Sequence, residues 1–315
     1  MNKLSIIVPC YNEQEALPHF YKEITGILLE LKVNYNLIFI NDGSTDNTLK
    51  LMKEFAENDE HVLYFSFSRN FGKEAAMYAG FCNADGDYVA VMDADMQDPP
   101  SLLPKMIEIL ENENYDSVAT RRIDREGEPI VRSWFARKFY YVINMISDAD
   151  IVDGARDFRL MKREMVDAIL SMSEYNRFSK GIFGWVGFKT CWISFENRAR
   201  VAGETKWNFW KLTKYAIDGI INFSSAPLNV ASWSGMFMTV LAFVFLIIII
   251  VRKLLWGDPV AGWASQVCIM IFIGGIQLFC MGIMGQYIAK IYMETKSRPH
   301  YIISDTNSKD AVKIK

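Results

Sequence analysis

The chain has 315 residues with a formal net charge of −3, which is enough for one large domain or two smaller ones. A sequence pI near 5.8 gives no overall charge signature of nucleic-acid binding, so we expect no nucleic-acid partner. Five scattered cysteines without a CxxC pair exclude a disulfide framework and indicate reduced thiols.

The first 120 residues alternate apolar strands with helical stretches. Strands are expected at Leu4–Pro9, Tyr35–Ile40, Val62–Ser66, Tyr88–Met92 and Ser117–Thr120. The helices expected between them run to Leu31, to Ala56 after a cap at Asp46 or Asn47, over Gly72–Asn83, and over Leu102–Glu111. Continuous apolar strands separated by helices predict an α/β fold with a mostly parallel sheet covered on both faces. Ligands bind beyond the carboxyl ends of the strands in such sheets.

The fourth expected strand runs into the sequence MDADMQDPP (Met92–Pro100). Asp93 and Asp95, with the amide oxygen of Gln97, offer hard oxygen ligands that suit Mg²⁺ or Mn²⁺, ions that usually serve phosphate-bearing substrates. An isolated D-x-D also fits an acidic surface turn. Asp42 and Arg69 follow other strand ends, and this convergence favours a nucleotide cleft.

Three neighbouring residues are interpreted as structural. Asp98 is expected to cap the following turn. Lys73 and Glu74 are assigned to the helix after the third strand, with Arg69 nearer the cleft.

Two basic, aromatic stretches, 130–147 and 206–226, have the pattern of amphipathic helices that lie in a membrane interface. The alternative is that each is an ordinary helix packed on the sheet domain. We therefore expect a sheet domain over residues 1–205, followed by a juxtamembrane helix over 206–226.

Two uncharged runs follow, 24 residues at 228–251 and 26 residues at 263–288. At about 1.5 Å per residue, each is long enough to cross the roughly 30 Å hydrocarbon core of a bilayer, although a pair of buried core helices is the alternative. Basic residues flank both runs, and the N-terminus does not resemble a signal peptide. The sequence therefore predicts an extracytoplasmic loop at 252–262, with the sheet domain and both termini, including a 289–315 tail, in the cytoplasm.

Two further expectations concern the C-terminal part. The tail from Thr306 is polar and is expected to be flexible. Gly275, Gly282 and Gly285 fall on one helix face, where small residues allow close helix packing. That packing could be against the first span or between copies in a homo-oligomer.

Four strand-end motifs occur in order: VPCYNE (Val8–Glu13), INDGSTDNT (Ile40–Thr48), SFSRNFGKEAAMYAG (Ser66–Gly80) and MDADMQDPP. The ordered set closely resembles glycosyltransferase family 2 over nearly the whole chain. SRNFGKE, DADxQDPP and the later RVAGETKW (Arg200–Trp207) resemble the polyprenyl-phosphate glycosyltransferases, which include dolichol-phosphate mannose synthase and bacterial bactoprenol glucosyltransferases. With two terminal spans, the bacterial type is the closer match. The resemblance implies a GT-A-like sheet domain.

The resemblance also implies roles for the matching residues. The nucleotide sugar would be held by Pro9, Tyr11, Glu13, Asp42 and Ala94, and a divalent ion bridging its diphosphate by Asp93, Asp95 and Gln97. Arg121, Arg200 and Lys206 would contact phosphates, and Asp157 would lie near the acceptor or the sugar. Each of these roles has a structural alternative. Arg121 could be a solvated charge, Asp157 could pair with Arg156 or Arg159, and Lys206 could lie in a plain turn. Asp95, Asp157 and Arg121 are the catalytic candidates.

The implied activity is inverting transfer of a sugar, with UDP-glucose as the favoured donor, to undecaprenyl phosphate in a bacterial cytoplasmic membrane. A metal and cationic side chains would stabilise the charge that develops on the leaving UDP. A phosphate monoester has its second pKa near 6, so this acceptor needs little help from a general base.

Three other functions fit the sequence less well. A processive synthase would carry a QxxRW motif, which the chain lacks, and more spans. A catalytically inactive membrane scaffold is disfavoured by the intact acidic motifs. Transfer to a hydroxyl would need a general base, for which Asp157 is the candidate. The identity of the sugar, UDP against GDP, and Mg²⁺ against Mn²⁺ stay open at this point.

Overall fold

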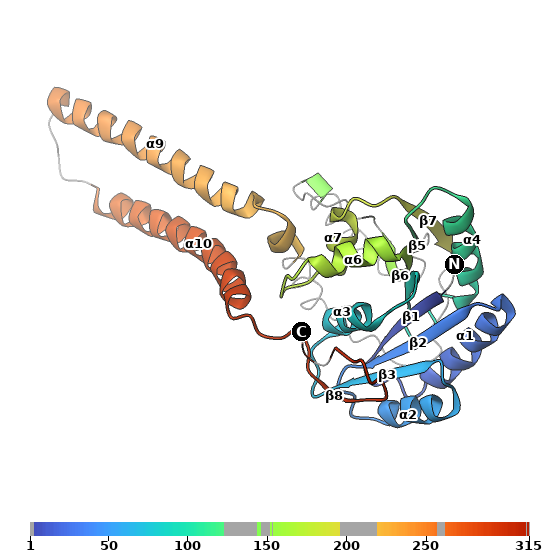
Figure 1. Cartoon of the computed structure of the whole chain (residues 1–315). Coiled ribbons are helices and arrows are strands. Elements are labelled where there is room, and N and C mark those ends of the chain that lie inside the picture. The colour runs from blue at the N-terminus through green and yellow to red at the C-terminus, as the bar shows by residue number, and fades with distance from the viewer. Residues whose placement is uncertain are drawn as a thin grey trace.

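The computed structural model describes residues 3–122, 144–145, 152, 154–195, 219–256, 262–312 and 314. They contain an eight-stranded sheet in the order β7-β5-β6-β4-β1-β2-β3-β8 (Figure 1). The strands are β1 (Lys3–Cys10), β2 (Asn34–Asn41), β3 (Val62–Phe67), β4 (Tyr88–Val91), β5 (Ser117–Arg122), β6 (Ala155–Lys162), β7 (Thr190–Phe195) and β8 (Ile303–Thr306). The five strands predicted in the first 120 residues are confirmed, each end within two residues.

The sheet is mostly parallel, as predicted. β1 pairs in parallel with β2 and β4, β2 with β3, and β5 with β7, whereas β6 and β8 run in the opposite direction. The antiparallel course of β6 was not predicted. It brings the amino end of β6 to the same edge as the carboxyl ends of β4 and β5. Side chains near Ala155 therefore lie beside those that follow β4.

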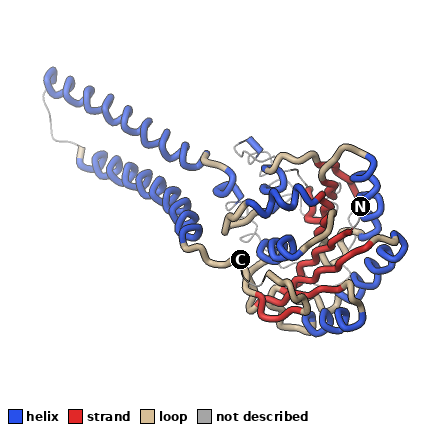
Figure 2. The backbone as a smooth tube through the Cα atoms, in the orientation of Figure 1, coloured by secondary structure: helices blue, strands red, loops and turns tan. Residues whose placement is uncertain are grey.

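Helices cover both faces of the sheet (Figure 2). They are α1 (Leu17–Leu31), α2 (Thr48–Asn58), α3 (Lys73–Asn83), α4 (Leu103–Asn112), α6 (Arg163–Ser171) and α7 (Ser179–Trp185), with a short 3₁₀ turn η1 (Pro100–Leu102). One apolar core lies between the sheet and α1, α2 and α4, and a second lies between the sheet and α3, α6 and α7. Burial of apolar strand residues on both faces explains why their sequences read as continuous hydrophobic runs.

The caps around α2 differ from the expectation in detail. Asn47 occupies the N-cap position, but its side chain makes no capping hydrogen bond. The Asp46 carboxylate instead accepts a hydrogen bond from the Thr48 amide at 3.0 Å. Asp46 therefore shapes the turn that leads into the helix.

Two long helices, α9 (Ala226–Trp256) and α10 (Trp263–Thr295), lie side by side and extend away from the sheet domain (Figure 1). Each contains a segment apolar and long enough to cross a membrane, Ala226–Phe245 and Ile269–Thr295. Their apolar side chains are largely exposed, with 6% and 0% of the most apolar windows buried. Helices of a soluble core would instead hide these side chains, so they are candidate membrane spans.

The glycine face of α10 does not pack against α9. Gly275, Gly282 and Gly285 are exposed, and a Cβ atom added at any of them would meet no heavy atom within 4 Å. The contacts between the helices come from another face, where the Cys280 thiol lies 3.6 Å from the Ser234 hydroxyl. The expectation of intramolecular packing through these glycines is therefore wrong.

The segment after α10 returns to the sheet domain. β8 pairs antiparallel with β3, and the Asn307 side chain accepts a hydrogen bond from the Tyr64 amide at 2.9 Å. Tyr301 is fully buried and stacks on Phe67 with ring centroids 5.4 Å apart. The expected flexible tail from Thr306 is therefore wrong for the described residues, because backbone pairing and aromatic burial fix this segment to the sheet edge.

Replacing Tyr301 by alanine should detach this edge strand. Losing a fully buried aromatic ring costs about 3–5 kcal/mol, so we expect the midpoint of thermal unfolding to fall by roughly 10 °C in detergent solution. Ile302→Ala is a matched control, because Ile302 is 37% exposed. Equal unfolding midpoints for the two variants would contradict the fixed position of the C-terminal strand.

Several predictions fall outside the described residues. The 130–147 stretch contributes only Asn144 and Met145, which are helical, and the 206–226 stretch is described only from residue 219. The interfacial placement of both stretches stays a prediction. Arg200 and Lys206 also lie outside the described residues.

Candidate active site

The carboxyl ends of β1, β2, β3 and β4 meet at one edge of the sheet. In register, Pro9 lies beside Ile40 and Ile40 beside Phe65, while Ile7 lies beside Val91. The loops that follow these strands therefore converge, as the sequence predicted. They bring together Tyr11, Glu13, Asp42, Arg69, Asp93, Ala94 and Asp95 at one end of the domain.

The loops after β1 and β2 are joined by short polar contacts. The Asn12 amide donates to the Ser44 hydroxyl at 2.9 Å, and the Thr45 amide donates to the Asn12 side chain at 2.8 Å. Gly43 has a φ of +66°, and a Cβ atom there would lie 2.5 Å from the backbone of Arg69. The DGS turn thus needs glycine, since it both bends left-handed and touches the loop after β3.

Asp42 is buried at the base of this edge, with 4% of its surface exposed. Its carboxylate accepts hydrogen bonds from the amides of Phe71 at 2.6 Å and Gly72 at 3.0 Å, which orders the loop before α3. Burial raises the pKa of Asp42 to about 6, while these amides and Arg69 act in the opposite direction. Asp42 thus lies where a nucleotide role was predicted, and it also supports the loop that carries Lys73.

This raised pKa gives a pH dependence of known sign. Between its ordinary value of 3.8 and about 6, the native carboxyl keeps a proton that the unfolded chain has lost. The contribution of Asp42 to the free energy of unfolding is therefore largest below pH 4 and is lost as the pH rises through 6. Asp42→Asn should accordingly gain stability relative to wild type between pH 4.5 and 7.5, by about 1–3 kcal/mol. Thermal unfolding of both proteins at the two pH values checks this; a difference that stays constant or shrinks would contradict it.

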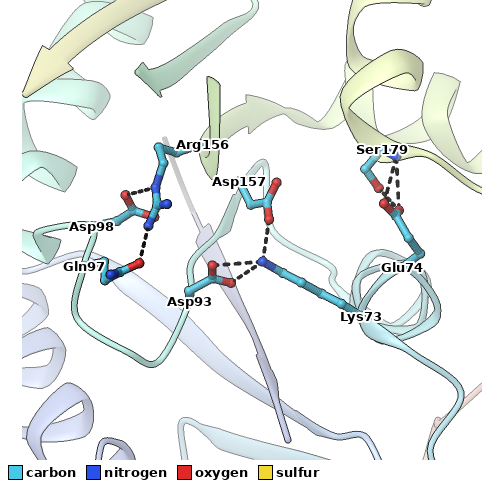
Figure 3. Close-up of polar contacts among 8 residues, drawn as sticks. All are labelled: Lys73, Glu74, Asp93, Gln97, Asp98, Arg156, Asp157 and Ser179. Carbon is cyan, nitrogen blue, oxygen red and sulfur yellow. Dashed lines mark hydrogen bonds and ion pairs between the residues drawn. The ribbon is translucent and has the colours of Figure 1, made fainter. Parts of the chain in front are cut away.

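Lys73 joins two central carboxylates, Asp93 in the loop after β4 and Asp157 on β6 (Figure 3). Its ammonium lies 2.7 Å from an Asp93 oxygen and also pairs with Asp157, and the three side chains are 42%, 23% and 19% exposed. Burial acts to raise the pKa of Asp157, but Lys73, Lys180 and Arg156 hold that pKa well below its ordinary value. Asp157 is therefore a stable anion and a weak base.

A second cation organises the turn after Asp95. Arg156 donates from Nε to Asp98 at 2.8 Å and from Nη2 to the Gln97 side-chain oxygen at 3.1 Å (Figure 3). Met96 within this turn has a φ of +61°, and the Gln97 amide donates to an Asp95 oxygen at 3.1 Å. Asp98 makes no capping hydrogen bond to η1, so its expected capping role is wrong; it is buried because Arg156 neutralises it.

The other predicted residues lie around this centre. Pro9 is the penultimate residue of β1, and Tyr11 is 37% exposed in the loop that follows. Ala94 is buried between the two aspartates. Arg121 lies on β5 in register with Ala155, and its Nε donates to the Ser194 hydroxyl at 2.9 Å. The residue paired with Arg121 on the neighbouring strand β6 therefore directly precedes Arg156.

Lys73 and Arg156 are the site residues that the sequence did not assign. The sequence placed Arg69 nearer the cleft, but Arg69 is exposed and lies over the Phe71 ring, whereas Lys73 reaches both carboxylates. One signal was available: Lys73 begins α3, and a cation is unfavourable at a helix N-terminus unless an anion compensates it. Arg156 could not be placed without the direction of β6.

The donor set suits a divalent ion held partly by substrate. Asp93, Asp95 and Gln97 supply only oxygen ligands and are partly exposed, as Mg²⁺ and Mn²⁺ sites require. In the part of the chain that the structure describes, no three His, Cys, Asp or Glu side chains form a group that could hold a metal. Remaining ligands would therefore come from diphosphate and water, which is the usual arrangement for Mg²⁺.

Residues 5–170 match the family described as Glycosyl transferase family 2. The chain is 42% identical over 304 residues to the putative glycosyltransferase CsbB of Bacillus subtilis, covering 96% of this chain and 92% of that one. It is 40% identical over 301 residues to the bactoprenol glucosyl transferase of Shigella phage SfX, covering 96% and 98%. A solved structure of glucosyl-3-phosphoglycerate synthase from Mycobacterium tuberculosis, in complex with Mn²⁺, UDP-glucose and phosphoglyceric acid, has 18% identity and a TM-score of 0.46, over 70% of this chain and 78% of that one.

Proposed function

This chain belongs to glycosyl transferase family 2, and from that membership we propose that it transfers glucose from UDP-glucose to undecaprenyl phosphate, with inversion at the anomeric carbon. The relatives named bactoprenol glucosyl transferase, similar over 96% of this chain, support both the sugar and the acceptor. The observation that carries the proposal is the Asp93–Lys73–Asp157 group at the carboxyl edge of the sheet, in a chain that continues into two exposed apolar helices.

The reaction follows from the charges of the two substrates. An oxygen of the acceptor phosphate attacks the anomeric carbon, the bond from that carbon to UDP breaks, and the electron pair leaves with UDP. A phosphate monoester is largely dianionic at neutral pH, so no proton has to be removed from the nucleophile. Asp93, Asp95 and Gln97 would hold Mg²⁺ or Mn²⁺, which when bound would neutralise charge on the leaving diphosphate.

Each protein side chain has a separate task in this scheme. Asp42, Tyr11 and Glu13 would bind the nucleoside at the ends of β1 and β2. Lys73 fixes the positions of Asp93 and Asp157 relative to one another. Arg121, with Arg200 and Lys206, would offset the negative charge that accumulates when two anions meet.

Two alternatives fit the site less well. Transfer to a hydroxyl group needs a base of near-neutral pKa, and the low pKa of Asp157 makes that residue a poor candidate. A non-catalytic scaffold has no need to keep Lys73 and Arg156 paired with the acidic residues of the MDADMQDPP motif. Both features favour an active transferase with a phosphate acceptor.

The proposed location is a bacterial cytoplasmic membrane, with the sheet domain in the cytoplasm. Pairing of β8 with β3 keeps the segment after α10 on the same side of the membrane as the sheet. If α9 and α10 both cross the bilayer, the connection between them lies on the opposite side. The basic flanks of the two helices favour the cytoplasm for the sheet side.

A donor panel tests this function. Full-length protein in membranes would receive UDP-glucose, UDP-N-acetylglucosamine, UDP-galactose or GDP-mannose, with and without undecaprenyl phosphate, in Mg²⁺ or Mn²⁺. Thin-layer chromatography should reveal a glucosylated lipid only when UDP-glucose and the lipid are both present. Products that form only without the lipid would refute the acceptor, and failure to bind any donor would favour the scaffold.

A further inference from the structure

A pocket of about 200 Å³ lies beside the active site, between the sheet and α7. Its lining includes three cationic side chains and three aromatic rings. These are Arg156, Arg159 and Lys180, and Phe183, Phe188 and Trp192. Arg159, Lys180 and these rings take no part in the proposed binding of the nucleotide sugar or the divalent ion. Such a lining combines positive charge with apolar surface, which suits an anionic ligand that carries an apolar group.

Arg159 is the strongest sign of a ligand. Arg159 is buried, with 4% of its surface exposed. Among the described residues, however, no carboxylate forms an ion pair with Arg159, and its Nε has no hydrogen-bond partner. Its Nη1 donates to the hydroxyls of Ser117 at 2.9 Å and Thr190 at 3.2 Å. A buried guanidinium is strongly destabilising unless an anion pairs with it, so an open donor at this position indicates a missing anion.

The rest of the pocket supports the same interpretation. The Arg159 guanidinium lies 4.6 Å from the centre of the Phe183 ring and 5.3 Å from that of Trp192, which holds it in place without neutralising it. Lys180 makes no hydrogen bond or ion pair within the described ranges and is near enough to Asp157 to lower its pKa. Arg159 and Lys180 can therefore each donate a further hydrogen bond to an anion in the pocket.

The position of α7 links the pocket to both the active site and the membrane helices. Glu74, next to Lys73, accepts hydrogen bonds from the amide and hydroxyl of Ser179, the first residue of α7 (Figure 3). On the other side, the ring of Phe178 lies 5.9 Å from that of Phe223, three residues before α9 begins. The helix α7 that lines the pocket therefore also contacts the active-site helix α3 and the segment that leads into the first apolar helix.

We propose that this pocket binds the acceptor substrate, with Arg159 and Lys180 on its phosphate monoester and the first prenyl units against Phe183, Phe188 and Trp192. The assignment rests on the proposed function, because it presumes a lipid-phosphate acceptor. The donor diphosphate is the less suitable occupant, since its predicted ligands Asp42, Asp93 and Asp95 do not line the pocket.

Binding of short prenyl phosphates to the full-length protein in detergent tests this assignment. Isothermal titration calorimetry would compare farnesyl phosphate, farnesol, inorganic phosphate and UDP-glucose as titrants. Lys180→Met removes one cation at a partly exposed position, and Arg159→Lys keeps the charge but removes the planar donor group. Lys162→Met is the matched control, since Lys162 lies on the same strand as Arg159 and outside the pocket.

Loss of a charge-assisted hydrogen bond should weaken farnesyl phosphate binding roughly 10- to 100-fold in both pocket variants, with UDP-glucose binding unchanged. Lys162→Met should match wild type. Unchanged farnesyl phosphate binding in both variants, or a loss of UDP-glucose binding instead, would overturn the pocket assignment. Inorganic phosphate binding as tightly as farnesyl phosphate would overturn the lipid part.

The same measurements separate this inference from the proposed function. If wild type binds UDP-glucose but not farnesyl phosphate, the lipid-phosphate acceptor itself fails, and the pocket assignment fails with it. If wild type binds both and the variants behave like wild type, only the pocket assignment fails.

Discussion

Asp95→Ala is expected to lower turnover by about 1,000-fold or more, because in the proposed mechanism it removes a charged ligand of the divalent ion at the point where negative charge develops on the leaving group. Asp95 is partly exposed at the sheet edge, so truncating its side chain leaves no buried cavity. The midpoint of thermal unfolding should therefore stay within a few degrees of wild type.

A second variant separates the charge of Asp95 from its structural contact. The Asp95 carboxylate accepts a hydrogen bond from the Gln97 amide, and Asp95→Asn can preserve that bond while removing the charge. If the charge holds a divalent ion, Asp95→Asn should be nearly as inactive as Asp95→Ala. Recovery of activity in Asp95→Asn would assign the residue to the turn alone.

Ion binding can be measured apart from turnover. Electron paramagnetic resonance of Mn²⁺ in the presence of UDP should detect a bound ion in wild type and much weaker binding in both Asp95 variants. Asp167→Ala is the control, because Asp167 is 59% exposed on α6 and its ion pair with Arg163 is worth little. An Asp95→Ala protein with wild-type turnover would refute the metal assignment.

The first strands of the sheet were predictable from sequence because the residues that identify each of them are close together in the chain. β1 to β4 contain apolar runs buried on both faces, and each is followed by a turn signal or a helix with its own periodicity. Parallel strands of this kind leave polar residues at one edge, so the convergence of Asp42, Asp93 and Asp95 followed from the strand ends alone.

The contributions of β6 and β8 were not predictable in the same way. β6 has the sequence ARDFRLMK, whose charges hide its strand character, and its pairing with β4 spans about 70 residues. β8 follows a membrane-length helix and pairs with β3 across more than 230 residues. The direction and the partner of such strands depend on contacts between residues far apart in the chain. The sequence therefore predicted neither the pairing of Arg156 with Asp98 nor the burial of Tyr301.

Lys73→Met is expected to lower kcat by roughly 100- to 1,000-fold, since it leaves Asp93 and Asp157 facing one another without the cation that joins them. The loss of stability should be moderate, about 1–3 kcal/mol, because the Lys73 side chain is 42% exposed but its removal leaves the 19% exposed Asp157 without its main cation. Lys50→Met on α2 is the control for removal of an exposed lysine, since the Lys50 side chain is 75% exposed.

The pH profile distinguishes the role of Lys73 in positioning Asp157 from a general loss of positive charge. Burial acts to raise the pKa of Asp157 and Lys73 is the main influence that lowers it, so Lys73→Met should move this pKa upward. Asp157 would then become protonated on acidification in the variant while it stays ionised in wild type. The ratio of variant to wild-type kcat should therefore fall as the pH is lowered from 8 to 5. Titration of Asp42 and of the acceptor phosphate is common to both proteins and cancels in this ratio.

Two outcomes would contradict this role. A ratio independent of pH would mean that Lys73 acts without changing the ionisation of Asp157. A Lys73→Met kcat equal to that of Lys50→Met would show that Lys73 takes no part in the active site.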